Sequence, residues 1–414
     1  MTPRPPVPKT PAPNLPPAPG VAAARARRRD RRVYTRAHPV LFALLAATRR
    51  RPFVRLGGTV LVHGTDAYRR TLTRVPLDRT AAGTTGGTAR ELSTATAGKP
   101  SVDSIRRPPE GGLLFDQEGD GHREARRSVA DSLGAAGVER LRPVWRAVLD
   151  RCLAPLDAGR PVDLVPIARE LAGATVCALL GTGPGADPSV LAAAAGDAAS
   201  AAVRDHLPGP RRPGSARAAA EAAARLETLL ATSGGGFADG GLRAMLAVAA
   251  VNTTVAALPR AAAWCADAGL WDQAADDRLR PALVTELLRV TAPSPLLPRV
   301  AAAAADATAG GCPVRAGDRL VLVARHAARA HDTPPDARRP MAPAVSQLVF
   351  GAGPHACPGA RLARAQLDDV LASLAPRRPV VVRARVDRRA ALPGWRTLTI
   401  RALSPNTTPP AEDR

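Results

Sequence analysis

One short stretch near the C-terminus gathers residue types that bind metals and anions. Residues 350–364 read FGAGPHACPGARLAR. Gly353 and Gly359 flank Cys357 where the backbone must turn tightly and approach another group closely. A helix that begins near Gly359 would direct its N–H groups and its positive end at the sulfur, which favours the thiolate. A thiolate held by backbone donors, with an aromatic residue at the base of the loop, is what an axial ligand of haem iron requires.

Two other interpretations of this stretch stay open on the residues alone. Cys357 could be a buried structural cysteine in a glycine-rich loop. The G-x-G at 351–353 could belong to a phosphate-binding loop, although that short motif is weak by itself. His355 lies two residues before the cysteine, within reach of an anionic group such as a haem propionate.

The other cysteines disfavour a disulfide framework or a zinc ribbon. The chain has five in all, widely spaced and without any C-x-x-C pair. This usage favours a reducing cytoplasm. The other four are Cys152, Cys177, Cys265 and Cys312.

The elements that must position the loop are mostly helices. Alternating Val-rich segments predict a hairpin at 53–64 and short strands elsewhere. The sequence therefore predicts a mostly α fold with small β-sheets. The expected helices are 120–134, 137–156, 165–180, 188–205, 214–232, 240–268, 279–290 and one from Gly359 to about 375; the further strands lie near 298–302, 319–323, 380–386 and 395–402.

The net charge of +22 and the isoelectric point near 11.4 invite a nucleic-acid or membrane interpretation. Almost all of this charge is arginine, since Lys9 and Lys99 are the only lysines. Only 3% of the residues are aromatic, which is few for base-stacking platforms. We therefore interpret the charge as a residue-usage bias spread over the surface, and we expect no nucleic-acid partner.

The two ends of the chain are expected to lie outside the folded domain. Residues 1–30 are rich in proline and arginine and predict a disordered tail, followed by one domain over 31–405 and a short tail at 406–414. The apolar run at 39–47 is too short to span a bilayer, so we expect an amphipathic helix there and no membrane contact. A glycine-rich stretch at 80–115 predicts a long functional loop.

The whole pattern F-G-x-G-x-H-x-C-x-G-x-x-L-A-R resembles the haem-binding loop of the soluble bacterial cytochromes P450. The resemblance covers about residues 35–405. It implies a triangular prism with haem b, iron protoporphyrin IX, between the long helix and the helix after Cys357. Cys357 is then the iron ligand, with Phe350, Gly351 and Gly359 shaping its loop.

Four basic residues match the propionate-binding positions of that family. DGHREARR places His122 and Arg126 one helical turn apart, as in the family's H-x-x-x-R. Arg299, in LPRVA, and His355 complete the set that the resemblance implies. Two carboxylates need cationic donors, although each residue alone also fits a solvated surface charge.

The E-x-x-R pair of the family matches Glu286 and Arg289, which share one helix face and suit a bracing ion pair. Two other pairs have the same spacing, Glu124 with Arg127 and Glu139 with Arg142. Position distinguishes them, because only Glu286 lies some seventy residues before Cys357, as the family's pair does.

The long helix departs from the family's oxygen-binding segment, (A/G)-G-x-(D/E)-T-(T/S). The matching residues read AAVNTT, with Thr253 at the position of the oxygen-site threonine. Ala250 replaces the glycine and Asn252 replaces the acid. An amide orients water but does not exchange protons as a carboxylate does, which puts the usual proton delivery in doubt.

The resemblance implies a cytoplasmic, monomeric monooxygenase that inserts one oxygen atom from O2 into a small organic substrate, with a role in secondary metabolism. Electrons would come from an acidic ferredoxin and an NAD(P)H-dependent reductase, with Arg361 and Arg364 facing the ferredoxin or Arg364 serving the structure. The missing acid at position 252 motivates the alternatives of peroxide-driven chemistry, oxidative coupling, desaturation or rearrangement. A haem protein without catalysis or an arginine-rich nucleic-acid binder is the alternative from another class. The expected pocket includes 80–115, 206–213, Ala247, Ala250, 295–297 and 395–400.

Overall fold

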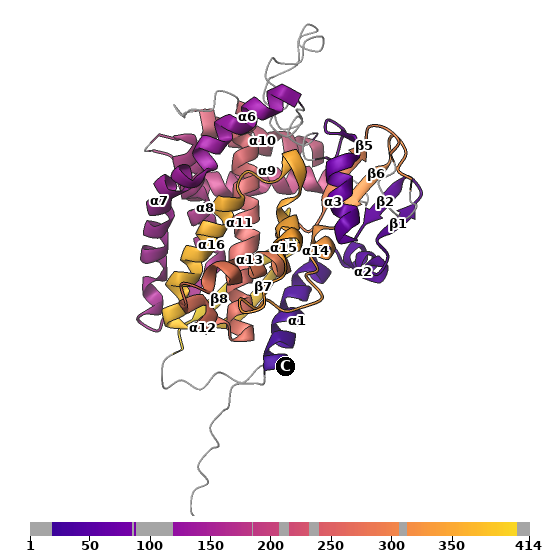
Figure 1. Cartoon of the computed structure of the whole chain (residues 1–414). Helices are drawn as coiled ribbons and strands as arrows, with labels where there is room; N and C mark the ends of the chain where they lie inside the picture. The colour runs from indigo at the N-terminus through magenta and orange to yellow at the C-terminus, as the bar shows by residue number, and fades with distance from the viewer. Residues whose placement is uncertain are drawn as a thin grey trace, which may run out of the picture.

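The computed structural model describes residues 19–84, 87, 119–183, 185–206, 215–231, 240–305 and 313–403. In these residues a large helical part adjoins a smaller part built around a sheet (Figure 1). The expected loop at 80–115, the break at 206–213, the tail at 406–414 and Cys312 lie mainly or wholly outside the described residues.

Each expected helix is observed to within a few residues at each end, and further helices, α1 and the short α12, α14 and α15 among them, were not expected. Each follows the apolar spacing that places one face on the core. The helices are α1 (Pro19–Ala37), α2 (Pro39–Thr48), α3 (Thr65–Arg74), α6 (Gly119–Leu133), α7 (Ala135–Leu153), α8 (Leu164–Leu180), α9 (Pro188–His206), α10 (Ser215–Ala231), α11 (Gly240–Ala268), α12 (Trp271–Ala275), α13 (Arg280–Thr291), α14 (Ala324–Ala327), α15 (Pro343–Ser346) and α16 (Ala360–Leu374).

Two small sheets accompany the helices. The five-stranded sheet has the order β1-β2-β6-β5-β3, and the three-stranded sheet has the order β4-β8-β7. The expected hairpin is confirmed, with Gly57 at a φ of +59° in its turn. The strands are β1 (Phe53–Leu56), β2 (Thr59–Val62), β3 (Leu77–Asp78), β4 (Val162–Asp163), β5 (Leu297–Ala301), β6 (Arg319–Leu322), β7 (Val380–Asp387) and β8 (Gly394–Arg401).

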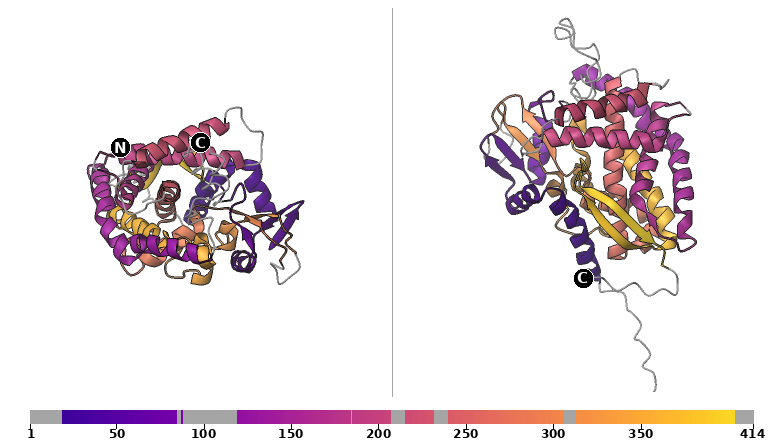
Figure 2. Two further views of the ribbon diagram at one scale, coloured as in Figure 1. Left: turned by 90° about the horizontal axis from the view of Figure 1, so that it is seen from above. Right: turned by 180° about the vertical axis from the view of Figure 1, so that it is seen from behind.

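Helix α11 runs through the centre of the helical part, and Figure 2 (left) looks down it. It contacts α8, α9, α13, α16 and the β7–β8 hairpin. Among the described residues it is the one helix long and apolar enough to cross a membrane, but 67% of its apolar window is buried inside the fold. Its apolar character is thus explained by its place in the main core.

The expected disorder of residues 1–30 is wrong for residues 19–30, because helix α1 begins at Pro19. Ala22, Ala26, Asp30 and Val33 recur at helical spacing and are buried, so this face packs on the core. The arginines that suggested disorder lie mostly on the outer face of the same helix. The proline- and arginine-rich composition therefore led to a prediction of disorder although the buried residues have helical spacing.

Asp30 anchors α1 to the core by binding two buried arginines. Its carboxylate lies 2.7 Å from Arg260 in α11 and 3.0 Å from Arg325 in α14. Both guanidinium groups stack on the Tyr34 ring, at 4.6 and 4.0 Å from its centroid. We call Asp30, Tyr34, Arg260 and Arg325 the Asp30 cluster.

Helix α2 forms where the apolar run predicted a helix, but it is not amphipathic. It buries Leu45 and leaves Val40 and Leu44 exposed. Because apolar residues also lie on its exposed side, the helix has no polar face.

Candidate functional site

The Cys357 loop is held by backbone bonds that require glycine. Gly351 and Gly353 have φ values of +80° and +75°, which side chains other than glycine rarely adopt. The Cys357 N–H donates to the Phe350 carbonyl over 2.8 Å. A Cβ on Gly353 would lie 3.2 Å from the Thr73 side chain, so the loop packs closely against the end of α3.

The helix after the cysteine begins as expected, with Gly359 as the N-cap of α16. The Gly359 N–H donates to the Cys357 sulfur, but burial in the loop still raises the pKa of this thiol above its usual value. Arg126 and Arg364 act in the same direction as Gly359 without outweighing burial. Backbone donors alone therefore do not favour the thiolate as the sequence had led us to expect. The side chain is nevertheless exposed, so a metal ion can reach the sulfur, and coordination deprotonates a thiol.

The structure brings together the four basic residues that the family pattern had selected. The rings of His122 and His355 lie 3.9 Å apart, and Arg126 donates to the Ala356 carbonyl over 2.6 Å. Burial, together with nearby basic groups, Arg299 and Arg126 among them, lowers the pKa of His355 to about 3. A neutral histidine among cations is an arrangement that suits an anionic ligand.

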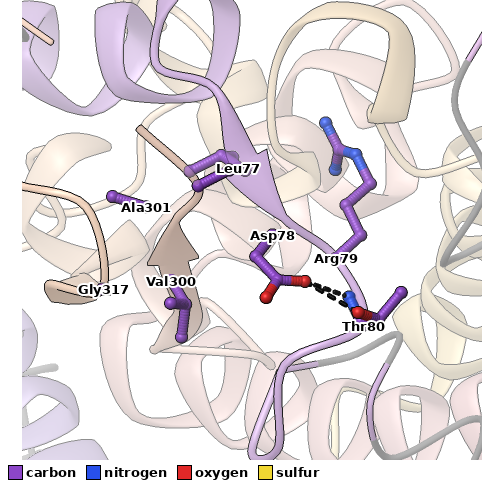
Figure 3. Close-up of a pocket in the computed structure, with 8 residues that line it drawn as sticks. Leu77, Asp78, Arg79, Thr80, Val300, Ala301 and Gly317 are labelled. Atoms are coloured by element: carbon purple, nitrogen blue, oxygen red, sulfur yellow. Dashed lines mark hydrogen bonds between the residues drawn. The ribbon is translucent and has the colours of Figure 1, made fainter. Parts of the chain in front are cut away.

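Sequence reasoning missed a fifth member of this group, Arg79. After burial, it is the strongest influence on the pKa of His355. It follows the two-residue strand β3 and lines an open pocket of about 490 Å³ with Thr80 and Val300 (Figure 3). A strand this short has no readable period, so nothing in the sequence marked Arg79.

Arg299 is held in a low-polarity position within this group. Its Nε atom is buried, and burial lowers the pKa of its guanidinium to about 10. Arg79 contributes in the same direction. We call His122, Arg126, Arg299, His355 and Arg79 the basic cluster.

The residues present fit a haem. An accessible cysteine in a glycine loop supplies one ligand for iron, and the basic cluster supplies donors for two carboxylates. Among the described residues, no group of three or more His, Cys, Asp or Glu side chains has a geometry that holds a bare metal ion.

Glu286 and Arg289 form the expected brace. Their side chains are 1% and 0% exposed and lie 2.6 Å apart. Arg289 also donates to the carbonyls of Arg329 and Thr333, and Glu286 accepts from the Met341 N–H. The pair fixes α13 to the chain that leads into the cysteine loop. By contrast, the Glu139 carboxylate, which has the same spacing, is 63% exposed.

The polar residues of α11 separate into two roles. The Thr253 hydroxyl is only half-buried and donates to the Ala249 carbonyl over 2.7 Å. The Asn252 amide donates to the carbonyls of Val248 and Ala195, which ties α11 to α9. Asn252 is thus engaged in helix packing. Ala250 is half-buried, and Ala247, which we expected in the pocket, is fully buried in the main core.

A buried chain of hydrogen bonds links the cysteine helix to its neighbours. Gln366 in α16 accepts from Thr254 over 3.4 Å and donates to Thr175 in α8 over 2.9 Å. All three side chains are buried. This chain, which sequence reasoning did not identify, fixes the spacing between α11 and α16. Thr254 faces α16, whereas its neighbour Thr253 is the more accessible of the two threonines.

The outer side of α16 carries a surface pocket of about 510 Å³ between α7 and α13. Arg361 is exposed there, whereas Arg364 stacks on the Phe350 ring at 4.6 Å and supports the loop. Of the two arginines, Arg361 is therefore the one available to a partner.

Solved structures share this architecture. The EryK protein of S. erythraea is 24% identical and aligns over 90% of this chain and 98% of its own, with a TM-score of 0.66. CYP109E1 of Bacillus megaterium, solved with testosterone, is 19% identical over 89% of this chain and 99% of its own (TM-score 0.68). P450BioI, solved with a fatty acid on an acyl carrier protein, is 18% identical with the same coverage and TM-score. No family profile matches the chain, and no curated protein matches it either.

Proposed function

We propose, from the cytochrome P450 fold that this chain has, that the protein is a haem-thiolate monooxygenase. It would insert one oxygen atom from O2 into a small organic substrate. The observation that carries the proposal is the joint placement of an accessible Cys357 in a glycine loop and a basic cluster beside the same loop. Each half of this arrangement serves a different part of one haem.

The protein residues would divide the work as follows. Haem, when bound, supplies the activation of dioxygen. Cys357 would ligate its iron, and the basic cluster would hold its carboxylates. The Thr253 hydroxyl, accessible on the central helix, would hold a proton at Oγ1 beside the reacting oxygen.

The electrons would come from an acidic ferredoxin and an NAD(P)H-dependent reductase. The surface pocket over α16 supports this proposal, because the exposed Arg361 of the cysteine helix lines it. An exposed arginine beside the cysteine helix would attract an acidic partner to this face.

The first test is the visible spectrum of the dithionite-reduced protein with carbon monoxide. A strongly red-shifted Soret band that is lost in Cys357→Ala would support thiolate-ligated haem. Cys177→Ala is the matched control, because this half-buried thiol lies outside the loop and its removal should leave the band unchanged. Absence of any Soret band, with haem supplied during expression, would refute the proposal.

A second candidate is a haem-thiolate reaction other than oxygen insertion, such as peroxide-driven oxidation, coupling, desaturation or rearrangement. The Asn252 hydrogen bonds favour it, since a side chain committed to two carbonyls does not shuttle protons. The two candidate reactions differ in the oxidant and the electron source that they need. Product formation that consumes NADH and O2 in a fixed ratio supports the monooxygenase, whereas product formed from peroxide alone supports the second candidate.

The setting we propose is a cytoplasmic monomer in bacterial secondary metabolism. The four cysteines in the described part of the chain are free thiols, which suits a reducing compartment. EryK, which shares the fold, was solved with erythromycin B, and OxyD acts in the biosynthesis of vancomycin-type antibiotics. These neighbours support a substrate from the same broad class of natural products.

A further inference from the structure

Helix α2 leaves an apolar side uncovered at the edge of the smaller, sheet-containing part (Figure 1). Its inner side, with Leu41, Phe42 and Leu45, packs on residues of β1, β2 and β6. On the outer side, Val40 is 81% exposed and Leu44 is 40% exposed. We call the exposed outer residues the α2 face, and they are Pro39, Val40, Ala43, Leu44, Ala46 and Ala47.

The α2 face is a continuous apolar stripe. Val40, Ala43, Leu44 and Ala47 follow the i, i+3, i+4, i+7 spacing that places residues on one side of a helix. Single exposed apolar residues are common in proteins, but an exposed helix side without any polar residue is not, unless it binds something. Packing does not account for the stripe, because the opposite side of α2 fills the core.

Arginines lie at both ends of the α2 face. Arg36 precedes it at the end of α1, and the three arginines at 49–51 follow it directly. All four side chains are exposed. The sequence has no Asp or Glu over residues 31–65, so no acidic neighbour in the chain offsets this charge. An apolar stripe between two basic ends fits a partner that is apolar and anionic.

We propose that the α2 face docks on the surface of a membrane that contains anionic lipids. The stripe would enter the boundary between headgroups and acyl chains, and the arginines would lie level with the lipid phosphates. We expected no membrane contact because the run is too short to span a bilayer, but a helix that lies along the surface needs no such length. This inference goes beyond the proposed function and does not depend on bound haem.

A second copy of the chain fits the same face less well. Two α2 faces packed together would bring the arginines of both copies close to one another, and like charges oppose association. Helix α2 has ten residues and is therefore about 15 Å long, far too small for the roughly 1,200 Å² of a stable interface. Anionic headgroups would instead neutralise the arginines.

Co-sedimentation with vesicles tests the docking. The purified full chain is mixed with vesicles of phosphatidylcholine, with or without phosphatidylglycerol. We expect binding only to the vesicles with phosphatidylglycerol, and weaker binding as the salt concentration rises. The triple variant Arg49→Gln, Arg50→Gln, Arg51→Gln should bind roughly a hundred-fold more weakly, because each arginine at an anionic surface contributes about five-fold.

A matched triple variant separates the α2 face from the charge of the whole chain. Arg383→Gln, Arg385→Gln and Arg396→Gln remove the same charge from exposed positions of the β7–β8 hairpin. With a net charge of +22, a non-specific attraction would weaken equally in both triple variants. We expect the hairpin variant to bind nearly as wild type does. Equal losses in the two variants would overturn the inference.

Insertion of the stripe gives a readout that charge alone does not move. The fluorescence of Leu44→Trp should be quenched by phosphatidylglycerol vesicles with brominated acyl chains, whereas that of Val190→Trp, at an exposed apolar position of α9, should not. The four native tryptophans are buried and give a constant background. A vesicle-bound Leu44→Trp protein without quenching would contradict the docking of this face.

Sedimentation without lipid tests the second copy. Leu44→Ser should sediment as wild type does and bind vesicles roughly five-fold to ten-fold more weakly, because an apolar contact with the acyl chains is lost. A wild-type dimer that Leu44→Ser converts to monomers, together with no vesicle binding, would assign the face to a second copy instead. None of these measurements uses haem, so they can fail while the proposed function holds.

Discussion

The protein contains two groups of buried or half-buried arginines that are arranged in opposite ways. In the Asp30 cluster one carboxylate and one tyrosine ring serve Arg260 and Arg325. In the basic cluster arginines and histidines face one another around the cysteine loop. The first group contains a carboxylate, that of Asp30, whereas the second is the set of basic side chains gathered beside Cys357.

The pKa values of the arginines show the difference. Burial disfavours the charged form of Arg260, but Asp30 and Tyr34 outweigh it and the pKa is raised. Burial lowers the pKa of Arg299 to about 10, with Arg79 adding to the decrease.

The largest expected effect comes from removing the anion of the Asp30 cluster. Asp30→Ala leaves two buried guanidinium groups without their carboxylate and should lower the free energy of unfolding by about 3–5 kcal/mol. Urea unfolding followed by circular dichroism measures it. The control Asp66→Ala removes an exposed partner of Arg69 and should cost less than about 0.5 kcal/mol. Equal effects of the two substitutions would show that the cluster is not a structural anchor.

Glu286→Gln tests whether a buried ion pair contributes more to stability than an exposed ion pair of the same sequence spacing. We expect a loss of about 3 kcal/mol in the free energy of unfolding, because Arg289 would remain buried beside a neutral amide. Glu139→Gln is the matched control on α7, and its exposed carboxylate predicts a loss below about 0.5 kcal/mol. Thermal or urea unfolding of both variants, compared with wild type, decides the matter.

Histidines extend the comparison to acid pH. His63 and His326 share a hydrogen bond between their Nδ1 atoms, at 2.9 Å, and burial lowers their pKa values to about 4 and about 3. The unfolded chain binds protons below its ordinary histidine pKa of about 6.5, whereas the folded chain does not until about pH 4. Stability should thus be greatest above pH 6.5 and fall by about 2 kcal/mol per histidine at pH 5.

Urea unfolding at pH 7 and pH 5 measures this loss. His326→Gln removes one of the two histidines. The free energy of unfolding should then depend less steeply on pH, by the amount that corresponds to about one proton taken up on unfolding. An unchanged slope in this variant would mean that His326 is protonated in the folded protein at pH 5.

The smallest effect, and the one of opposite sign, is expected for the basic cluster. In protein produced without haem, Arg299→Gln should raise the free energy of unfolding by about 1 kcal/mol, because it removes a desolvated charge beside Arg79. Unfolding by urea detects the shift. A loss comparable to that of Asp30→Ala would show that Arg299 is a structural residue and would remove the contrast between the two clusters.

Much of the fold could be predicted from the sequence, because the spacing of apolar residues within a long helix is visible in the sequence itself. The apolar spacing of α7, α8 and α11 predicted their bounds closely, and the Gly57–Gly58 turn predicted the first hairpin. The cysteine loop was predicted from its motif. Positive φ explains the glycines at 351 and 353, whereas Gly359, with a φ of −82°, does not need the freedom of glycine.

The remaining features depend on residues that meet only in three dimensions. Asp30 lies among arginines in the sequence, and no neighbouring residue indicates that its ion-pair partners lie more than 200 positions away. Arg79 depends on the pairing of a two-residue strand with β5. The role of Asn252 depended on the approach of Ala195 in another helix. Local patterns carry none of these contacts.

The close packing of Gly353 against Thr73 bears on how the protein is synthesised. These residues are about 280 positions apart, and the Arg126 bond to Ala356 spans 230. The loop that would hold the cofactor thus needs both early and late parts of the chain, and no nascent chain shorter than about 360 residues contains it. We therefore expect haem capture to begin only once synthesis has passed about residue 360, after the central helices have already had time to collapse.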